Sequence, residues 1–294
     1  MSAQVPADAG RDTPRYAVFG RPVAHSLSPR IHAAFGAQLG IAMDYRAIEA
    51  DCAALPAALA AFAAAGGRGA NLTLPLKQAG LALCRQLAPR ARRAGSVNTL
   101  IRQGDAWLGD STDGAGLLRD LRERQACNPA GRRVLLLGAG GAARAAAFAL
   151  LDAGVAELAV SNRTAAHAVS LVDALGTPAH AITLPALDGA GPFELVVNAT
   201  SAGHAGAVLP LPASVFAAGA LAYDLSYGRA AQPFLTAAQA AGAARAVNGL
   251  GMLVEQAAES FALWQGVRPD TAALYASLQA ERAQADLPEH ADPR

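Results

Sequence analysis

The chain contains a single lysine, Lys77. The other 23 of its 24 Lys and Arg residues are arginine. A guanidinium stays protonated in proteins, whereas a lysine ammonium can shift its pKa and exchange a proton. Lys77 is therefore a candidate for proton chemistry. On the count alone, an equally good explanation is that genomic codon bias removed the other lysines. The residues around Lys77 must decide between these two explanations.

Lys77 ends the stretch Asn71–Lys77 (NLTLPLK), which follows a predicted strand at 69–73 and enters a predicted helix at 76–87. The positive end of a helix dipole disfavours an added cation, so this position suits a group that exchanges a proton near neutral pH. A second loop, Val23–Pro29 (VAHSLSP), places Ser26 and Ser28 after another predicted strand. These two hydroxyls would equally serve to cap a helix that begins at Pro29.

A glycine-rich turn follows the aliphatic run 133–137 and precedes an alanine-rich helix. Gly138, Gly140 and Gly141 permit a tight turn and close backbone approach, and the helix N-terminus offers free N–H groups. Because a strand precedes the glycines and a helix follows them, this context predicts a dinucleotide site.

The tip of the next predicted strand, 157–161, selects the nucleotide. NAD sites usually carry Asp or Glu about 20 residues after the glycines, where it accepts from the ribose 2′-hydroxyl. Here the strand runs into Asn162, Arg163 and Thr164 with no acid. An arginine can pair with a 2′-phosphate, so the sequence favours NADP over NAD.

Strands alternating with helices predict α/β architecture with parallel sheets. We expect strands at 15–20, 44–48, 69–73, 96–101, 133–137, 157–161, 195–198, 221–225 and 245–247, and helices at 30–39, 55–65, 76–87 and 114–124. A polar stretch near 113–130 is the expected domain boundary, since a new strand–helix unit begins after it.

Composition excludes several classes of protein. With 53% hydrophobic residues and 16% charged residues, the chain can bury a large core, and its net charge of +1 gives no basic field for nucleic acid. Its most apolar stretch, 134–160, contains three charged residues and so does not predict a membrane span. Three widely spaced cysteines favour a reducing cytoplasm, and the six histidines lack metal-site spacing.

Eight motifs together resemble the shikimate dehydrogenase family, from about residue 16 to about residue 269. In chain order they are SLSP, NxTxPxK, VNT, TDG, GAGGAA, NRT, NATSAG and GLGMLVEQAA. The resemblance implies a two-domain α/β fold with a central cleft. Residues 15–113 would form the substrate domain, completed by C-terminal helices at 251–283, and residues 114–250 a Rossmann-like NADP domain.

The resemblance also implies a substrate, 3-dehydroshikimate or shikimate, and a catalytic pair, Lys77 and Asp113. Whether Lys77 is the proton donor or an electrostatic partner stays open at this point. The implied substrate contacts are Ser26 and Ser28 at the carboxylate with Tyr227 nearby, and Thr73, Lys77, Asn98, Asp113 and Gln256 around the ring oxygens.

For the cofactor, the resemblance implies three groups of contacts along the second domain. They are Gly138, Gly140, Gly141 and Ala142 at the pyrophosphate; Asn162, Arg163 and Thr164 at the 2′-phosphate; and Thr200, Ser201, Leu225 and Gly249 toward the ribose and nicotinamide. Many relatives have a second arginine where this chain has His167, so the preference for NADP is expected to be weaker, above all once the histidine is neutral. Leu225 replaces a methionine of some relatives, which is a mild change.

Two other functions remain as alternatives to an NADP-dependent shikimate dehydrogenase. One is a quinate/shikimate dehydrogenase with relaxed cofactor use, and the other is a non-catalytic NADP-sensing regulator. Retention of both Lys77 and Asp113 argues against the sensor, which needs no proton relay. We expect no nucleic-acid or membrane partner, and a monomer or homodimer.

Overall fold

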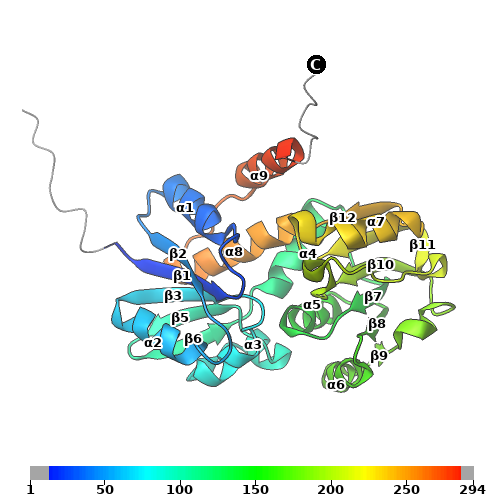
Figure 1. Ribbon diagram of the computed structural model, residues 1–294, viewed down its shortest axis with the longest axis horizontal. Coiled ribbons are helices and arrows are strands. Elements are labelled where there is room, and N and C mark those ends of the chain that lie inside the picture. Colours follow the sequence, from blue (N-terminus) through cyan, green and yellow to red (C-terminus); the bar gives the residue numbers. More distant parts are fainter. Residues whose placement is uncertain (1–12, 286–294) are drawn as a thin grey trace, which may run out of the picture. The chain divides into compact units, whose positions relative to one another are not determined.

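The computed structural model describes residues 13–285, which divide into two compact units (Figure 1). The first unit contains residues 13–92, Ser96–Ser111 and Ala257–Pro269. The second contains Arg93–Gly95, Thr112–Gln256 and residues 270–285. Helix α8 (Leu250–Gln265) contributes residues to both units. Within 13–285, no helix is both long enough and apolar enough to cross a membrane.

The first unit is built on a mixed six-stranded sheet with the order β2-β1-β3-β5-β6-β4. Strand β1 pairs in parallel with β2 and β3, whereas β5 runs antiparallel to both β3 and β6, and β4 pairs in parallel with β6. The strands are β1 (Arg15–Gly20), β2 (Asp44–Glu49), β3 (Gly67–Leu72), β4 (Gln86–Leu87), β5 (Thr99–Gln103) and β6 (Ala106–Asp110).

Both faces of this sheet are covered. One face packs Phe19, Leu72 and Leu100 against α2 (Leu55–Ala64) and α3 (Pro89–Ala94). The other face carries aromatic rings from α1 (Ser28–Leu39), β2 and α8. Burial on both faces explains why β1 reads as an apolar run rather than as an alternating strand.

The second unit has an all-parallel sheet with the order β12-β11-β10-β7-β8-β9. Its strands are β7 (Arg133–Leu137), β8 (Glu157–Ser161), β9 (Ala179–Ala181), β10 (Phe193–Asn198), β11 (Phe216–Asp224) and β12 (Arg245–Val247). The strand order reverses between β7 and β10. In doubly wound folds a ligand binds beyond the carboxyl ends of the strands at such a reversal.

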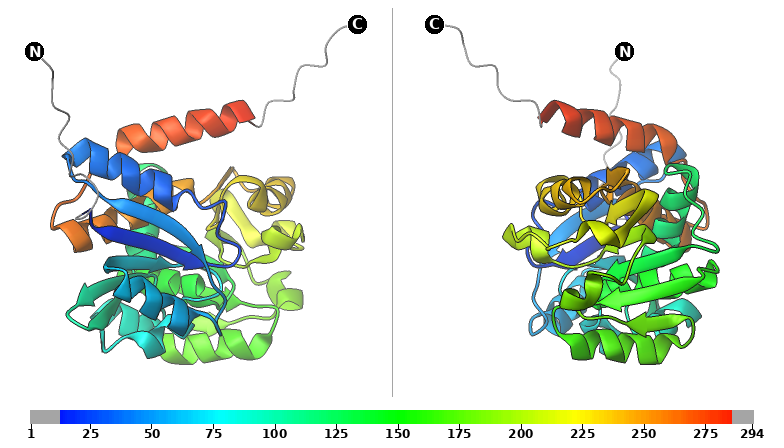
Figure 2. Two further views of the ribbon diagram at one scale, coloured as in Figure 1. Left: turned by 60° about the vertical axis from the view of Figure 1, so that its left-hand side comes forward. Right: turned by 90° about the vertical axis from the view of Figure 1, so that its right-hand side faces the viewer.

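Helices lie on both faces of the second sheet, as Figure 2 shows. Helices α4 (Asp113–Glu123), α5 (Gly141–Asp152) and α6 (Ala165–Leu175) share one buried cluster with β7, β8 and β10. Helix α7 (Gln232–Ala240) packs on the opposite face. The remaining segments are α9 (Ala272–Ala285) and the short 3₁₀ helices η1 (Ala79–Leu83), η2 (Leu184–Leu187), η3 (Ala202–Ala205), η4 (Ala213–Val215) and η5 (Gly228–Ala230).

The α/β prediction is confirmed, and the strands expected at 15–20, 133–137, 157–161 and 245–247 have the predicted bounds. Two expectations are wrong. The first sheet is mixed rather than parallel, and no α-helix spans 76–87: η1 and then the edge strand β4 occupy that stretch. The sequence reading also missed α3, β6 and β9.

Candidate active site

Lys77 lies in a turn beyond the carboxyl end of β3. The Leu76 N–H donates to the Thr73 carbonyl over 2.8 Å, and the Val97 N–H donates to the Lys77 carbonyl over 2.8 Å. These bonds hold Thr73 and Lys77 together beside the segment that leads into Asn98. Because no α-helix begins at Leu76, the helix-dipole argument for Lys77 is wrong. The hydrogen bonds of the turn instead fix the position of the Lys77 backbone.

Ser26 and Ser28 lie close together at the start of α1. Their hydroxyl oxygens are 3.2 Å apart, and the Ser28 N–H donates to Ser26 Oγ over 3.2 Å. The helix begins at Ser28, one residue earlier than Pro29, and its N-cap residue Leu27 provides no side-chain cap. Ser28 is buried and Ser26 half-buried. The pair therefore forms a compact hydroxyl site, and hydroxyls of this kind donate well to a carboxylate.

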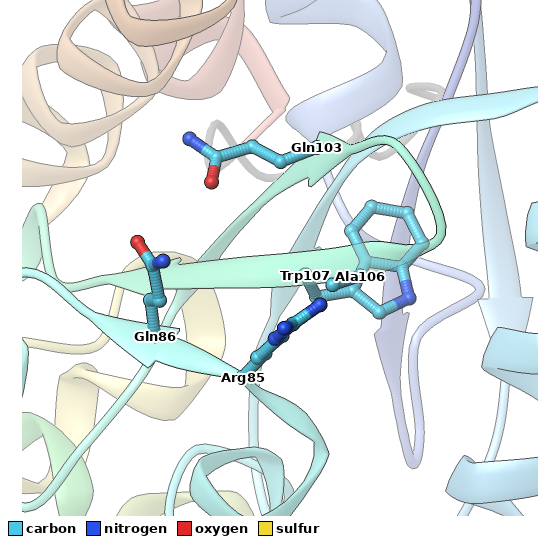
Figure 3. Close-up of a pocket in the computed structure, with 5 residues that line it drawn as sticks. All are labelled: Arg85, Gln86, Gln103, Ala106 and Trp107. Atoms are coloured by element: carbon cyan, nitrogen blue, oxygen red, sulfur yellow. The ribbon is translucent and has the colours of Figure 1, made fainter.

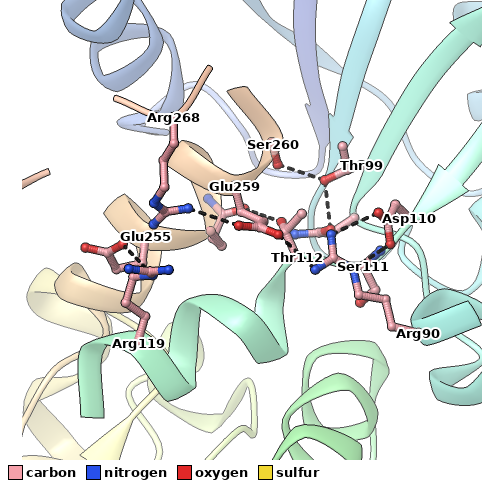
Figure 4. A network of polar contacts seen from close by, with 12 residues as sticks. Arg90, Thr99, Asp110, Ser111, Thr112, Arg119, Glu255, Glu259, Ser260 and Arg268 are labelled. Carbon is pink, nitrogen blue, oxygen red and sulfur yellow. Dashed lines mark hydrogen bonds and ion pairs between the residues drawn. The ribbon is translucent and has the colours of Figure 1, made fainter. Parts of the chain in front are cut away.

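Asn98 is 2% exposed and stands where β3, β5 and β6 meet. Its carbonyl accepts from the Leu72 N–H over 2.9 Å, and its N–H donates to the Asp110 carbonyl over 3.0 Å. The Asp110 carboxylate is held by Arg90 through two hydrogen bonds of 2.7 and 2.9 Å, as Figure 4 shows. Asn98 thus has a fixed backbone among buried neighbours.

In the second unit, Asp113 begins α4 and Gln256 lies on α8, and both are buried. Gly116 explains how these helices come so near to each other. A Cβ atom at Gly116 would lie 2.8 Å from Gln256 Cβ and 2.9 Å from the Met252 carbonyl oxygen, distances that packed atoms do not adopt. Helix α4, which begins at Asp113, therefore packs directly on the backbone of α8 at Met252 and Gln256.

The glycine turn after β7 has the features of a phosphate cradle. Gly138 has φ of 113°, which favours glycine, and its N–H donates to the Ser161 carbonyl over 2.7 Å. Gly140 is exposed, and a Cβ atom placed there would meet no protein atom within 4 Å. Helix α5 starts directly afterwards at Gly141, followed by Ala142. Open space faces a twelve-residue helix N-terminus, so the residues fit a pyrophosphate.

Arg163 is exposed just beyond β8, at the entry to α6. The Asn162 amide donates to the Thr164 carbonyl over 2.9 Å, which shapes the loop, and the His167 N–H donates to the same carbonyl over 3.0 Å. In the part of the chain that the structure describes, no carboxylate pairs with Arg163. An exposed guanidinium with a histidine one turn on is suited to bind a phosphate monoester.

The last residues of β10 and β11, Asn198 and Asp224, form a polar pair that the sequence reading missed. The Asn198 amide donates to Asp224 over 2.8 Å and its Oδ1 accepts from the Thr200 hydroxyl over 2.8 Å. Asp224 is fully buried, and burial raises its pKa to about 6. The signal was present, because each of these residues ends an apolar strand at the edge where the strand order reverses.

The remaining predicted cofactor and substrate residues lie on this edge of the second unit. Ser201 is exposed after Thr200, and the Gly249 N–H donates to the Ser226 carbonyl over 2.8 Å, next to Leu225. Tyr227 is half-buried, with the Arg282 guanidinium 4.9 Å from its ring centroid. The structure thus places the predicted cofactor residues from Gly138 to Thr200 at the ends of β7, β8 and β10.

A separate hollow, drawn in Figure 3, lies at the β4–β6 edge of the first unit. It is lined by Arg85, Gln86, Gln103, Ala106 and Trp107. None of the predicted site residues lines it, so the candidate site rests on the strand ends described above.

Comparison with known proteins agrees with these features. Residues 18–100 match the shikimate dehydrogenase substrate binding domain, residues 120–207 match shikimate/quinate 5-dehydrogenase, and residues 249–279 match the shikimate 5′-dehydrogenase C-terminal domain. A shikimate dehydrogenase (NADP(+)) of Xanthomonas euvesicatoria pv. vesicatoria is 57% identical over 274 residues, covering 92% of this chain and 96% of that protein. The chain belongs to the shikimate dehydrogenase family.

Two solved structures extend this relationship to the fold of the shikimate dehydrogenase family. The shikimate 5-dehydrogenase of Thermus thermophilus, solved in complex with NADP(H) and shikimate, is 40% identical with a TM-score of 0.79, covering 94% of this chain and all of that one. An Ael1 enzyme from Pseudomonas putida is 42% identical with a TM-score of 0.82, covering 90% of this chain and 98% of that one.

Proposed function

We propose that this protein catalyses the reversible, NADP-dependent reduction of 3-dehydroshikimate to shikimate, a step of chorismate and aromatic amino acid biosynthesis. The observation that carries the proposal is the 57% identity to a shikimate dehydrogenase (NADP(+)) over nearly the whole length of both chains. The structural relative that binds NADP(H) and shikimate supports the same reaction.

The substrate residues have roles that suit their chemistry. Ser26 and Ser28 donate to the substrate carboxylate, with Tyr227 nearby. Thr73, Asn98, Asp113 and Gln256 hold the ring hydroxyls. The substrate domain comprises residues 15–113 with C-terminal helices at 251–283, and the NADP domain residues 114–250. A rigid ring with a hydroxyl at several positions needs this rim of short polar groups, because each group discriminates by hydrogen bonding.

Lys77 acts as the general acid in the reducing direction. Its ammonium donates a proton to the ketone oxygen as the carbonyl carbon is reduced, and its amine is reprotonated from solvent. Asp113 accepts a hydrogen bond from the hydroxyl that forms. In the oxidising direction the Lys77 amine takes the hydroxyl proton. The fixed turn that holds the Lys77 backbone supports this role, since a proton donor must be well positioned.

Bound NADPH supplies the hydride for this reaction. Gly138, Gly140 and Gly141, with Ala142, hold the pyrophosphate against the α5 N-terminus, while Arg163 pairs with the 2′-phosphate between Asn162 and Thr164. Thr200 and Ser201 lie toward the ribose, and Leu225 and Gly249 toward the nicotinamide. The open space at Gly140 supports a bound pyrophosphate, and the absence of an acid at the β8 tip supports NADP over NAD.

Initial rates for shikimate and quinate, each with NADP⁺ and NAD⁺, test the proposal. We expect shikimate with NADP⁺ to give the highest kcat/KM by at least about tenfold, as loss of one matched polar contact costs at least that much. Comparable efficiency with quinate and NAD⁺ would favour the quinate/shikimate alternative. Nucleotide binding without turnover of either acid would favour the sensing alternative.

A further inference from the structure

A buried polar cluster lies beside one of the proposed substrate residues, Asn98. Its members are Tyr45 of β2, Asn71 of β3, Thr99 of β5 and Ser260 of α8, all in the first unit and at most 9% exposed. Buried polar groups need hydrogen-bond partners, so each donor in this cluster must be matched with an acceptor. We call it the Asn71 cluster.

The orientation of the Asn71 amide follows from its contact with Asn98. Asn71 Nδ2 lies 3.0 Å from the Asn98 carbonyl oxygen, which can only accept. Asn71 Oδ1 must then accept, and it does so from the Tyr45 hydroxyl over 2.7 Å. Tyr45 in turn stacks on His32, and the two ring centroids are 4.3 Å apart. One chain of hydrogen bonds therefore links Tyr45 to the Asn98 backbone.

The Thr99 hydroxyl extends this hydrogen-bond network to the Asn98 side chain. Its hydroxyl accepts from Asn71 Nδ2 over 3.2 Å and donates to Asn98 Oδ1 over 2.9 Å. A hydroxyl has one hydrogen, so the 2.8 Å contact with Ser260 is donated by Ser260 (Figure 4). Ser260 also accepts from Asn71 Nδ2 over 3.0 Å. The two hydrogens of the Asn71 NH₂ group thus face three acceptors, so one hydrogen is shared between two of them.

This arrangement decides which end of the Asn98 amide can face a ligand. Oδ1 is engaged by Thr99, so the edge of the amide turned away from Thr99 is its NH₂ group, a donor. From this geometry we propose that Thr99, held by Asn71 and Ser260, is a positioning residue that makes Asn98 present a donor to a substrate oxygen. The inference rests on the proposed function, because it concerns the same substrate site.

Thr99→Val tests the inference, since it keeps the shape of Thr99 and removes the hydroxyl. We expect KM for shikimate to rise about tenfold, the value of one hydrogen bond in a binding site, with kcat within about threefold and KM for NADP⁺ unchanged. Thr99→Ser should restore KM to within about twofold of wild type. Ser96→Ala is the matched control, because Ser96 Oγ in the same segment is buried with no hydrogen-bond partner among the described residues.

A double-mutant cycle separates positioning from general destabilisation. In an Asn98→Ala background, Thr99→Val should change KM for shikimate less than about twofold, because the amide that Thr99 orients is gone. An equal rise in both backgrounds, or no rise in the wild-type background, would overturn the inference. If Thr99→Val fails to fold, Tyr45→Phe, which removes the donor to Asn71, replaces it: KM for shikimate should rise about threefold, and an unchanged KM refutes the inference.

These results are distinguishable from failure of the proposed function. If wild-type protein does not oxidise shikimate with NADP⁺, the function is wrong. If it does and Thr99→Val has the wild-type KM, only the positioning role is wrong. Calorimetric binding of shikimate without nucleotide gives a readout that does not depend on turnover.

Discussion

The Val97 N–H donates a 2.8 Å hydrogen bond to the carbonyl oxygen of Lys77. This bond joins the turn after β3 to the start of β5, so the only lysine of the chain and Asn98 are held by one local framework. A lysine side chain is long and flexible, and fixing its backbone reduces the volume that its amine explores. In the proposed function these two residues contact the same substrate.

Gly116→Ala should impair substrate handling without abolishing nucleotide binding. The added methyl group would overlap Gln256 and Met252, so α4 and α8 must separate and move Asp113 with Gln256. We expect kcat/KM for shikimate to fall at least about tenfold, together with about 1–3 kcal/mol of stability. Calorimetry should give a Kd for NADP⁺ within about threefold of wild type.

Gly131→Ala is the control for this substitution. Gly131 has φ of 72° in open space, so alanine there is strained and destabilises the chain without touching α4 or α8. Its kcat/KM should stay near the wild-type value. If both variants lose activity equally, the loss reflects stability and the close approach of α4 to α8 has no special role.

Arg163→Ala should raise KM for NADPH at least about tenfold while changing KM for NADH less than about twofold, because only NADPH offers the 2′-phosphate. His167→Arg adds a permanent charge one helical turn away and should lower KM for NADPH severalfold. Steady-state kinetics with both nucleotides measure these effects. Equal changes for NADPH and NADH would show that Arg163 does not bind the phosphate.

Asp224 predicts a pH dependence of stability. Burial raises its pKa from the ordinary 3.8 to about 6, so between these values the folded state binds more protons than the unfolded state. The contribution of Asp224 is therefore fully present below pH 3.8 and is lost as the pH rises through 6. Urea unfolding of wild type and Asp224→Asn should show the wild-type advantage falling by about 2 kcal/mol between about pH 4 and about pH 7. A difference that is constant with pH would contradict the assignment.

Much of the fold could be predicted because its signals are local. The run at 133–137 is apolar, flanked by arginine and glycine, and needs no distant information to be recognised as a buried strand. The helix expected at 76–87 failed for a tertiary reason. Gly80 packs so closely on Leu72 that an added Cβ would overlap it, and the chain forms the 3₁₀ helix η1 at this contact. The two-residue strand β4 exists only through its pairing with β6.

Some residues of the candidate site could also be predicted from the sequence, and others could not. Arg163 can be found from the sequence because it directly follows a recognisable strand, whereas Thr73 is implied by the family resemblance. The partners of Asn198 and Asn98 could not be found in this way. Asp224 lies 26 residues from Asn198 and meets it only through the pairing of β10 with β11. Asn71 reaches Asn98 through the pairing of β3 with β5.

Lys77 also permits a chemical test, since its amine is the only one on a side chain. An amine-selective acylating reagent should inactivate the enzyme, and saturating shikimate should slow the inactivation. Lys77→Arg serves as the control, because only the N-terminal amine remains to react, and its residual activity should resist the reagent. Inactivation at full rate with shikimate bound would place Lys77 outside the substrate site.

The most direct test of the central claim is kcat for shikimate oxidation by Lys77→Arg, with wild type and Lys77→Met in parallel. Arginine keeps the positive charge but stays protonated, so it cannot accept the hydroxyl proton. If Lys77 transfers that proton, kcat should fall about 100-fold or more in both variants, with folding and NADP⁺ binding retained. Near-normal turnover by Lys77→Arg would contradict the account.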